Sequence, residues 1–153
     1  MNTTVTKEII HKNKKVAYDF SIIEIYEAGM VLTGTEVKVL RQKRANITDA
    51  YVAIDNNNEA FVYNINIPQY EFGNISNHQE TRKRKLLLHK TQISEVYQRM
   101  KAEGLTAVPL SIYFLGRKVK LEFALVKGKK KFDKREDAAK KEIQKKIKAE
   151  FGL

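Results

Sequence analysis

Two neighbouring segments alternate between apolar and polar residues with a period of two, and this pattern constrains the fold more than any other feature of the chain. The first segment is VPLSIYF, residues 108–114, and the second is VKLEFAL, residues 119–125, with LGR as a turn-like tripeptide between them. Such alternation is typical of strands with one buried face. Pro109 suits a strand start or a sheet edge, because proline cannot donate to the sheet ladder. The two segments therefore predict two strands of a β domain.

Earlier segments predict two further strands joined by a turn. Apolar and polar residues alternate from position 18 to position 22, which indicates a strand that begins near residue 16. Ile23 breaks the alternation and predicts a bulge or a strong bend. The tripeptide EAG at 27–29 predicts a tight turn into a second strand, MVLTG, at 30–34.

A β-hairpin is predicted in the middle of the chain. ITDAYVAI (47–54) and AFVYNINI (60–67) flank the turn-rich stretch DNNNE. Pro68 is expected to end the second strand, and residues 69–85 have the composition of a long polar connection. The residues expected on one face of that second strand are Phe61, Tyr63, Ile65 and Ile67.

Two segments have helical spacing. TEVKVLRQKR, 35–44, predicts a short helix with Thr35 as its N-cap and Glu36 in its first turn. Its apolar side is expected to consist of Val37 and Leu40. A second helix is predicted to begin at Thr91 and to stop at Gly104. Its apolar positions, spaced for one helix face, are Ile93, Val96, Tyr97 and Met100.

These elements amount to about six short antiparallel strands and two helices. Such a set predicts a mainly β domain with flanking helices, in which a six-stranded antiparallel barrel of the oligonucleotide-binding (OB) kind forms. A two-layer α+β sheet is the alternative that the pattern leaves open. At 153 residues the chain is expected to form one domain.

Charge divides the chain unevenly. It carries 29 Lys and Arg residues against 18 Asp and Glu, a net charge of +11, of which residues 127–153 contribute +6. We therefore expect a basic lead-in at 1–15, an OB-like barrel domain at 16–127 and a basic tail at 128–153. In the tail an apolar residue recurs every four positions, which predicts a helix that is marginal alone and that either docks on the body or folds on a polyanion.

Composition and motifs argue against several classes of protein. The chain has no cysteine, which excludes disulfides and thiolate metal sites and fits a reducing, cytoplasmic setting. We find neither the apolar stretch of a signal peptide nor a membrane span. The three histidines lie in different segments, and no phosphate-binding loop, dinucleotide fingerprint or nucleophile elbow is present. We expect no enzyme activity, no metal and no cofactor.

The positive charge predicts a polyanionic partner, with nucleic acid favoured over an anionic membrane surface. TRKRKLLLHK, 81–90, surrounds three leucines with cations, which indicates either a phosphate-binding cluster or a solvated loop followed by a core anchor. A second basic cluster comprises Lys14, Lys15, Lys38, Arg41, Lys43 and Arg44. Six aromatic residues are candidates either for base stacking or for the core, namely Tyr18, Tyr26, Tyr51, Phe61, Tyr63 and Phe72.

Five blocks of the sequence, taken in order, resemble a known family. They are YEAGMVLTGTEVKVLR, ANITDAYV, RKRKLLLHK, VPLSIYF and KGKKKFDKRE, and they span roughly residues 13–136. They resemble the SsrA-binding protein family, also called small protein B. The resemblance implies a non-catalytic OB-type barrel with flanking helices that binds the tRNA-like domain of transfer-messenger RNA (tmRNA).

The resemblance also implies how such a protein acts. It would accompany tmRNA into the A site of stalled bacterial ribosomes for trans-translation, in place of the missing anticodon arm. Its basic tail would become helical along the empty mRNA channel and contact ribosomal RNA. We expect no membrane partner and a monomer.

The family's functional residues map onto this chain position by position. The RNA-binding surface falls on Asn13, Lys14, Lys15, Glu27, Glu36, Lys38, Arg41, Asn46, Arg82, Arg84, Lys85 and Leu87. The ribosome-binding motif of the tail falls on Gly128, Lys129, Lys130, Asp133, Lys134 and Arg135. After Arg135 the chain lacks the further arginines and the tryptophan that family tails often carry.

The two acidic members of this surface have two interpretations. Glu27 and Glu36 either accept hydrogen bonds from base amino groups or a 2′-hydroxyl, or hold a neighbouring Arg or Lys in place. Leu87 supports an RNA-contacting loop through packing in one interpretation and contacts RNA in the other. Two other functions are weighed against this one: a different OB-type ribosomal or single-strand-binding protein, and an RNA-modifying enzyme, for which no histidine or carboxylate constellation is found.

Overall fold

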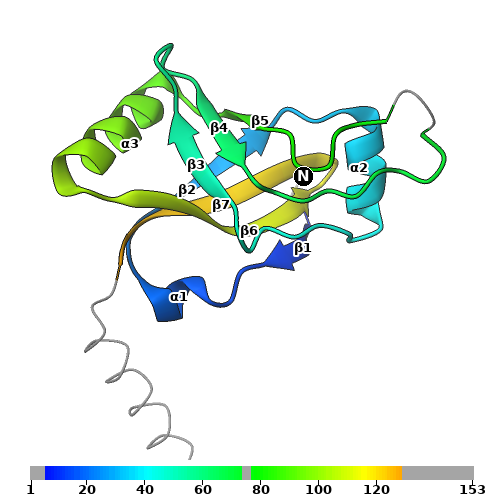
Figure 1. Ribbon diagram of the computed structural model, residues 1–153, viewed down its shortest axis with the longest axis horizontal. Helices are drawn as coiled ribbons and strands as arrows, with labels where there is room; N and C mark the ends of the chain where they lie inside the picture. Colours follow the sequence, from blue (N-terminus) through cyan, green and yellow to red (C-terminus); the bar gives the residue numbers. More distant parts are fainter. Residues whose placement is uncertain (1–5, 74–76, 129–153) are drawn as a thin grey trace, which may run out of the picture.

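The computed structural model describes residues 6–73 and 77–128, which form seven strands and three helices (Figure 1). The sequence predicted six strands and two helices, so the mainly β character is confirmed and the count is corrected. The elements are β1 (Lys7–Lys12), α1 (Val16–Asp19), β2 (Phe20–Met30), α2 (Gly34–Arg41), β3 (Tyr51–Ile54), β4 (Ala60–Tyr63), β5 (Arg84–Leu87), α3 (Lys90–Glu103), β6 (Thr106–Leu115) and β7 (Lys118–Gly128).

All the strands pair antiparallel in one sheet, in the order β1-β6-β3-β4-β5-β2-β7, and β6 also pairs with β7. The pairings therefore run from β6 through β3, β4, β5, β2 and β7 and return to β6. The long β6–β7 hairpin is the pair predicted from the alternating segments. Figure 1 shows α3 at one end of the strands and α2 at the other.

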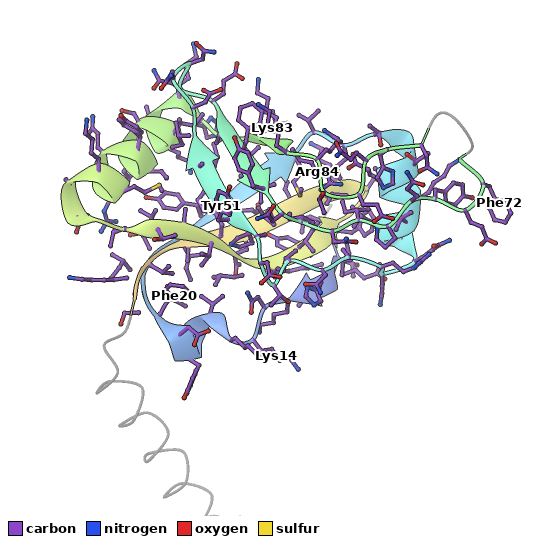
Figure 2. All side chains as sticks on the ribbon, viewed as in Figure 1. Lys14, Phe20, Tyr51, Phe72, Lys83 and Arg84 are labelled. Atoms are coloured by element: carbon purple, nitrogen blue, oxygen red, sulfur yellow. The ribbon has the colours of Figure 1, made fainter. Side chains whose placement is uncertain are left out.

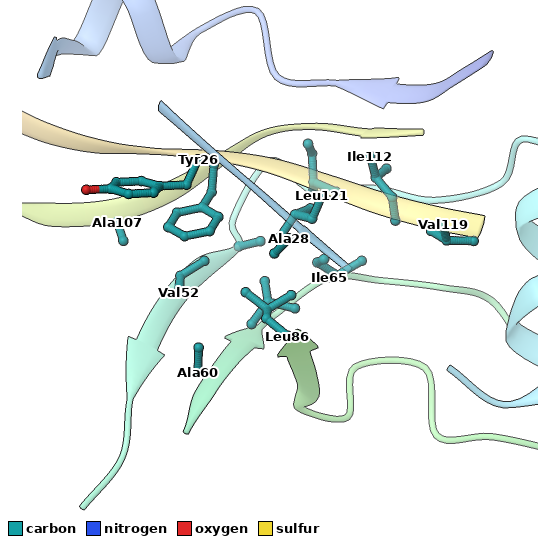
Figure 3. Packing of buried hydrophobic residues seen from close by; sticks show 14 of the residues in the cluster. Tyr26, Ala28, Val52, Ala60, Ile65, Leu86, Ala107, Ile112, Val119 and Leu121 are labelled. Carbon is teal, nitrogen blue, oxygen red and sulfur yellow. The ribbon is translucent and has the colours of Figure 1, made fainter. Parts of the chain in front are cut away.

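The core lies between the strands, where the inward residues of each strand meet (Figure 3). Tyr26 of β2 stacks on Phe123 of β7, with ring centroids 5.5 Å apart. Val39 and Leu40 of α2 and Val96 of α3 are fully buried and cover the two ends. Burying one such aliphatic side chain contributes about 1.5–3 kcal/mol, so these contacts help to hold the two helices in place.

The basic lead-in expected at residues 1–15 contains a strand that was not predicted, because residues 7–12 form β1 and pair with β6. The sequence gives little sign of this strand, because Ile10 alone among its residues is buried. The register also shifts between Ile9 and His11, which breaks a regular alternation. Pairing with a neighbouring strand, rather than burial of one face, therefore defines β1.

Residues 16–30 differ from the prediction in two ways. Residues 16–19 form the short helix α1, and β2 then runs without interruption to Met30. The bulge expected at Ile23 is confirmed by the register shift between Ile22 and Glu24. The turn expected at 27–29 is wrong, because β2 stays paired with β7 there, with Gly29 opposite Lys120.

The first long helix begins earlier than predicted. Thr33, rather than Thr35, is the N-cap of α2, and its hydroxyl accepts from the Glu36 backbone N–H at 3.4 Å. The Glu36 carboxylate accepts in return from the Thr33 backbone N–H at 2.9 Å, which completes a capping box. The buried side of α2 includes Val39 and Leu40, whereas Val37 is half-buried.

The central hairpin is confirmed, but one face is corrected. β3 and β4 pair from Tyr51↔Tyr63 to Ile54↔Ala60. Asn64 adopts a left-handed backbone with φ of 64°, which changes the direction of the chain after β4. Consequently Ile65 is fully buried, whereas Phe61 and Tyr63 face outward and are half-buried.

The expected polar connection at 69–85 overlaps a strand that sequence patterning missed. β5 is short and alternates between buried and exposed residues, beginning with a buried arginine. The following helix, α3, is confirmed, although His89 precedes it as N-cap in place of Thr91. Gly104 ends α3 with a left-handed φ of 65°, as a C-terminal glycine commonly does. No helix in the described ranges is long and apolar enough to cross a membrane.

Candidate nucleic-acid interface

Three of the predicted RNA-binding residues meet in an ion cluster, in which Glu36 and Arg84 are fully buried and the side chain of Arg82 is 29% exposed. Glu36, in the first turn of α2, is 0% exposed and accepts hydrogen bonds from both Arg82 and Arg84. The Arg82 Nη2–Oε1 distance is 2.5 Å and the Arg82 Nε–Oε2 distance is 3.2 Å. The cluster therefore ties the end of the 64–83 connection and the start of β5 to α2.

Arg84 has no exposed surface left for RNA. Its Nε donates to Glu36, and its Nη1 donates to the Ile65 carbonyl at 2.7 Å. Its Nη2 donates to the Glu80 carbonyl at 3.0 Å. Because Arg84 is 0% exposed, the structure favours a positioning role for this residue, and its direct contact with RNA stays a prediction. Arg84 and Glu36 position the polypeptide, which is the supporting role considered for Glu36.

The surroundings of Glu36 and Arg84 shift the pKa values of both side chains. Burial on its own would raise the pKa of Glu36, but hydrogen bonds from Arg82, from the Thr33 backbone and from Arg84 outweigh burial and lower that pKa. Burial lowers the pKa of Arg84, and the Glu36 carboxylate opposes this change. Both groups therefore remain charged at neutral pH, and they form an ion pair with each other.

A prediction for acid stability follows from the lowered pKa of Glu36. A carboxylate with a folded-state pKa below its ordinary value of 4.5 stabilises the fold fully above that value. The stabilisation is lost as the pH falls through the folded-state pKa. We expect the difference in free energy of unfolding between the wild type and Glu36→Gln to stay constant from about pH 7 to pH 5 and to shrink below about pH 4. Urea titrations at each pH measure it; a difference that grows below pH 4 would contradict the assignment.

A groove of about 1070 Å³ opens between β2, β5, the tip of the β3–β4 hairpin and the start of α3. Glu27, Lys85 and Leu87, all predicted to bind RNA, line it. Leu87 is 55% exposed and closely approaches β2, since a Cβ added at Gly29 would stand 3.3 Å from the Leu87 Cβ. The structure thus brings together residues that are 60 positions apart in the sequence.

Glu27 is exposed at one side of this groove and is held by a buried tyrosine. The Tyr113 hydroxyl donates a hydrogen bond to the Glu27 carboxylate. Burial and the adjacent Glu27 raise the pKa of Tyr113, so its hydroxyl remains protonated and able to donate. Glu122 of β7 is the residue opposite Glu27 of β2 in the strand register. Lys7 Nζ lies 3.9 Å from the Glu122 carboxylate and 4.2 Å from the centroid of the Tyr113 ring. Lys7 thereby offsets the repulsion between the two carboxylates.

A second group of predicted residues lies around Thr48, away from the groove lining. Asn13 Nδ2 donates to the Thr48 carbonyl at 3.4 Å, and the Thr48 N–H donates to Asn46 Oδ1 at 2.8 Å. Lys14 and Lys15 are exposed beside Asn13. The side chains of both asparagines thus shape a loop junction and leave the lysines free to face solvent.

The remaining predicted residues lie on α2 and at the end of β7. Lys38 Nζ lies 5.2 Å from the Tyr70 ring centroid, and the Arg41 guanidinium lies 5.8 Å from that of Phe114. Both cations are exposed. Gly128 ends β7 opposite Phe20. The other tail positions, Lys129, Lys130, Asp133, Lys134 and Arg135, lie outside the described residues.

Several groove residues were not predicted from the sequence. They come from the hairpin tip, α3 and the polar face of β7, and they are Asn57, Asn58, Gln92, Tyr97 and Lys120. The asparagine-rich tip and the outward lysine of β7 are visible signals in the sequence. Nothing in the local pattern places them next to Glu27.

The histidines that the structure describes include two with structural roles. His78 is buried, and its Nε2 lies 2.9 Å from the Ile67 carbonyl while its Nδ1 lies 2.9 Å from the Thr35 hydroxyl. His11 Nδ1 accepts from the Ile47 N–H at 3.1 Å. Among the residues described, no group of three or more His, Cys, Asp or Glu side chains could hold a metal ion.

Comparison with known proteins gives consistent matches across most of the chain. The family model described as SmpB protein matches residues 10–152. The SsrA-binding protein of Thermosipho africanus is 51% identical over 141 residues, 92% of this chain and 94% of the relative. That of Halothermothrix orenii is 46% identical over 144 residues, 94% of this chain and 92% of the relative.

A solved structure has the same fold. It is a chain from work described as "tmRNA-SmpB: a journey to the center of the bacterial ribosome". The two chains superpose with a TM-score of 0.64 and are 38% identical in sequence. The match covers 84% of this chain and 87% of the solved one.

Proposed function

This chain belongs to the SmpB protein family, and from that premise we propose that it binds the tRNA-like domain of tmRNA and brings it to stalled ribosomes for trans-translation. The observation that carries the proposal is the groove in which Glu27, Lys85 and Leu87 meet. A folded RNA can present phosphates to the lysines of the groove, and a 2′-hydroxyl or a base amino group to the Glu27 carboxylate.

The proposal separates the predicted residues by their surroundings. The contacting residues are the surface-accessible ones, namely Asn13, Lys14, Lys15, Glu27, Lys38, Arg41, Asn46, Arg82, Lys85 and Leu87. Glu36 and Arg84 instead hold Arg82 and β5 in place, because both are fully buried. Exposed cations contribute mainly through release of phosphate counterions, whereas Glu27 contributes selectivity.

For the architecture, we propose that the six strands β2–β7 make the OB-like barrel and that β1 lies outside it. The return of the pairings to β6 supports this arrangement. Residues 16–127 then form the barrel domain, and residues 128–153 form the basic tail. We propose that this tail occupies the empty mRNA channel of the stalled ribosome, that the protein acts in the cytoplasm, and that it works by binding, without catalysis or a cofactor.

Replacing Lys85 tests the groove directly. Lys85→Ala is expected to weaken binding of the tRNA-like domain about three- to tenfold and to reduce the salt dependence of log Kd by about one unit, because one phosphate contact is lost. The fold should change little, since the Lys85–Glu59 ion pair, at 3.6 Å, is exposed. Fluorescence anisotropy at several salt concentrations measures both quantities.

Lys127→Ala is the matched control for that experiment. Lys127 is also an exposed lysine on a strand, but it lies at the far end of β7 from Lys120, the β7 residue in the groove lining. We expect its affinity for the tRNA-like domain to stay within twofold of the wild type. Equal affinities and equal salt slopes for the wild type and Lys85→Ala would remove Lys85 from the interface.

A further inference from the structure

Aromatic rings cover the outer face of the β3–β4 hairpin. Tyr51 and Tyr63 are opposite each other in the strand register, and their rings stack with centroids 5.1 Å apart and planes 10° apart. Val52 and Val62 point into the core, at 2% and 0% exposure, so their sequence neighbours face outward. Tyr51 is 42% exposed, which leaves ring surface open to a ligand.

Cations border these rings on the same face. Lys83 Nζ lies 4.7 Å from the centroid of Phe61, two residues before Tyr63 in β4. Lys85 pairs with Phe61 across β4 and β5. Figure 2 shows Tyr51 and Lys83 over the strands β3 and β4. We call Tyr51, Phe61, Tyr63 and Lys83 the aromatic face.

The two carboxylates of the hairpin tip, Asp55 and Glu59, already have partners. Asp55 Oδ1 accepts from the backbone N–H groups of Asn57 and Glu59, at 2.9 and 3.0 Å. The Glu59 carboxylate lies 3.6 Å from Lys85 Nζ. The carboxylates of the tip are therefore occupied by the contacts of the tip itself and by Lys85. The ammonium group of Lys83 lies over the Phe61 ring. Lys85 also lines the groove, so the aromatic face and the groove meet at this residue.

We propose that the aromatic face is a second RNA site, which takes unpaired nucleotides while the groove holds folded RNA. Exposed tyrosine rings provide flat surfaces on which successive bases stack with little sequence preference. Lys83 is placed to meet the phosphate beside a stacked base. This site goes beyond the proposed function, because none of its four residues belongs to the groove lining.

The first test uses the full-length protein and a 12-nucleotide oligouridine as the unpaired probe. Tyr51→Ala/Tyr63→Ala is expected to bind it about tenfold or more weakly at fixed salt, because stacking on two rings is lost. The salt slope should not change, since no phosphate contact is removed. The matched Tyr51→Phe/Tyr63→Phe variant keeps the rings and should bind within twofold of the wild type. Wild-type affinity in the alanine variant, or an equal loss in the phenylalanine variant, would overturn the proposal.

A crosslinking measurement on the unmodified protein keeps the test independent of folding. Oligouridine that contains 4-thiouridine should crosslink to Tyr51, Tyr63 or Phe61 on irradiation, as mapped by mass spectrometry. Crosslinks confined to other residues would overturn the proposal. The Tyr51→Ala/Tyr63→Ala variant should bind the isolated tRNA-like domain with an affinity within twofold of the wild type. The groove proposal is tested by the Lys85→Ala variant, so the two proposals can fail independently.

Two arms distinguish the source of the unpaired nucleotides. If tmRNA supplies them, full-length tmRNA should bind the alanine variant more weakly than the wild type, by at least fivefold. If ribosomal RNA supplies them, the alanine variant should instead bind isolated small ribosomal subunits at least fivefold more weakly than the wild type. A loss in neither arm would overturn the assignment of the aromatic face as an RNA site.

Discussion

Replacing Arg84 with methionine is expected to lower the free energy of unfolding by about 3–5 kcal/mol, because it leaves the Glu36 carboxylate buried without one of its two cationic partners. Arg84 also supplies hydrogen bonds to the carbonyls of Ile65 and Glu80. Methionine fills similar space but cannot donate to any of these oxygens. Urea unfolding at pH 7 measures the loss.

Two variants control this prediction. Lys83→Met makes the same chemical change at the preceding, exposed residue and should alter stability by at most about 0.5 kcal/mol. The double variant Glu36→Leu/Arg84→Met removes the orphaned carboxylate together with its partner. It should be more stable than Arg84→Met alone by at least about 1 kcal/mol. A loss below 1 kcal/mol in Arg84→Met would show that the cluster does not hold the fold.

This result also bears on how RNA-binding variants are interpreted. Removal of Arg84 should weaken RNA binding, but through displacement of β5 and Arg82 rather than through a lost contact. Lys85, one residue further on, is exposed in the groove and reports on contact itself. The two neighbours therefore distinguish a positioning role from a binding role.

Deleting residues 129–153 is expected to spare binding of the tRNA-like domain and to abolish peptide tagging on stalled ribosomes. All the groove residues lie before residue 121, so the interface remains. The deletion removes +5 of the net charge of +11, and long-range attraction to RNA falls accordingly. We expect affinity for the tRNA-like domain to fall by no more than about threefold, and tagging to fall at least a hundredfold.

A reconstituted reaction on a ribosome stalled without a stop codon measures the tagging. A second variant, in which a Gly-Ser segment of equal length replaces residues 129–153, separates the chemistry of these residues from their length. It should be as inactive as the deletion. Tagging at wild-type levels by either variant would remove the tail from the mechanism, and loss of RNA binding would show that the tail contributes to the groove interface.

The sequence predicted those elements whose signal is local. Strict alternation identified β6 and β7, and the i, i+3, i+4 spacing with Gly104 identified α3. β1 and β5 were missed because four to six residues with few apolar positions form strands only when a neighbouring strand pairs with them. The turn expected at 27–29 failed for a related reason, since β7 keeps β2 extended through its glycine.

The sequence predicted some of the residues that line the groove, Glu27, Lys85 and Leu87 among them, but not which of the predicted site residues are buried. Arg84 lies in the basic run RKRK, where the pattern gives it the same expected exposure as its neighbours. Its burial depends on Glu36, 48 positions earlier in the chain. Likewise, Glu27 is linked to Tyr113 across 86 positions. Long-range pairing of this kind leaves no periodic signal, so contact and support could not be separated from sequence alone.

The central claim is that the groove recognises a folded tRNA-like RNA rather than any polyanion. The most direct measurement is the Kd of the full-length protein for the tRNA-like domain of tmRNA and for an unstructured RNA of equal length, at the same salt concentration. We predict binding to the folded RNA at least tenfold tighter, with the difference reduced in Lys85→Ala. Equal affinity for the two RNAs would contradict the claim and would indicate a general single-strand-binding protein.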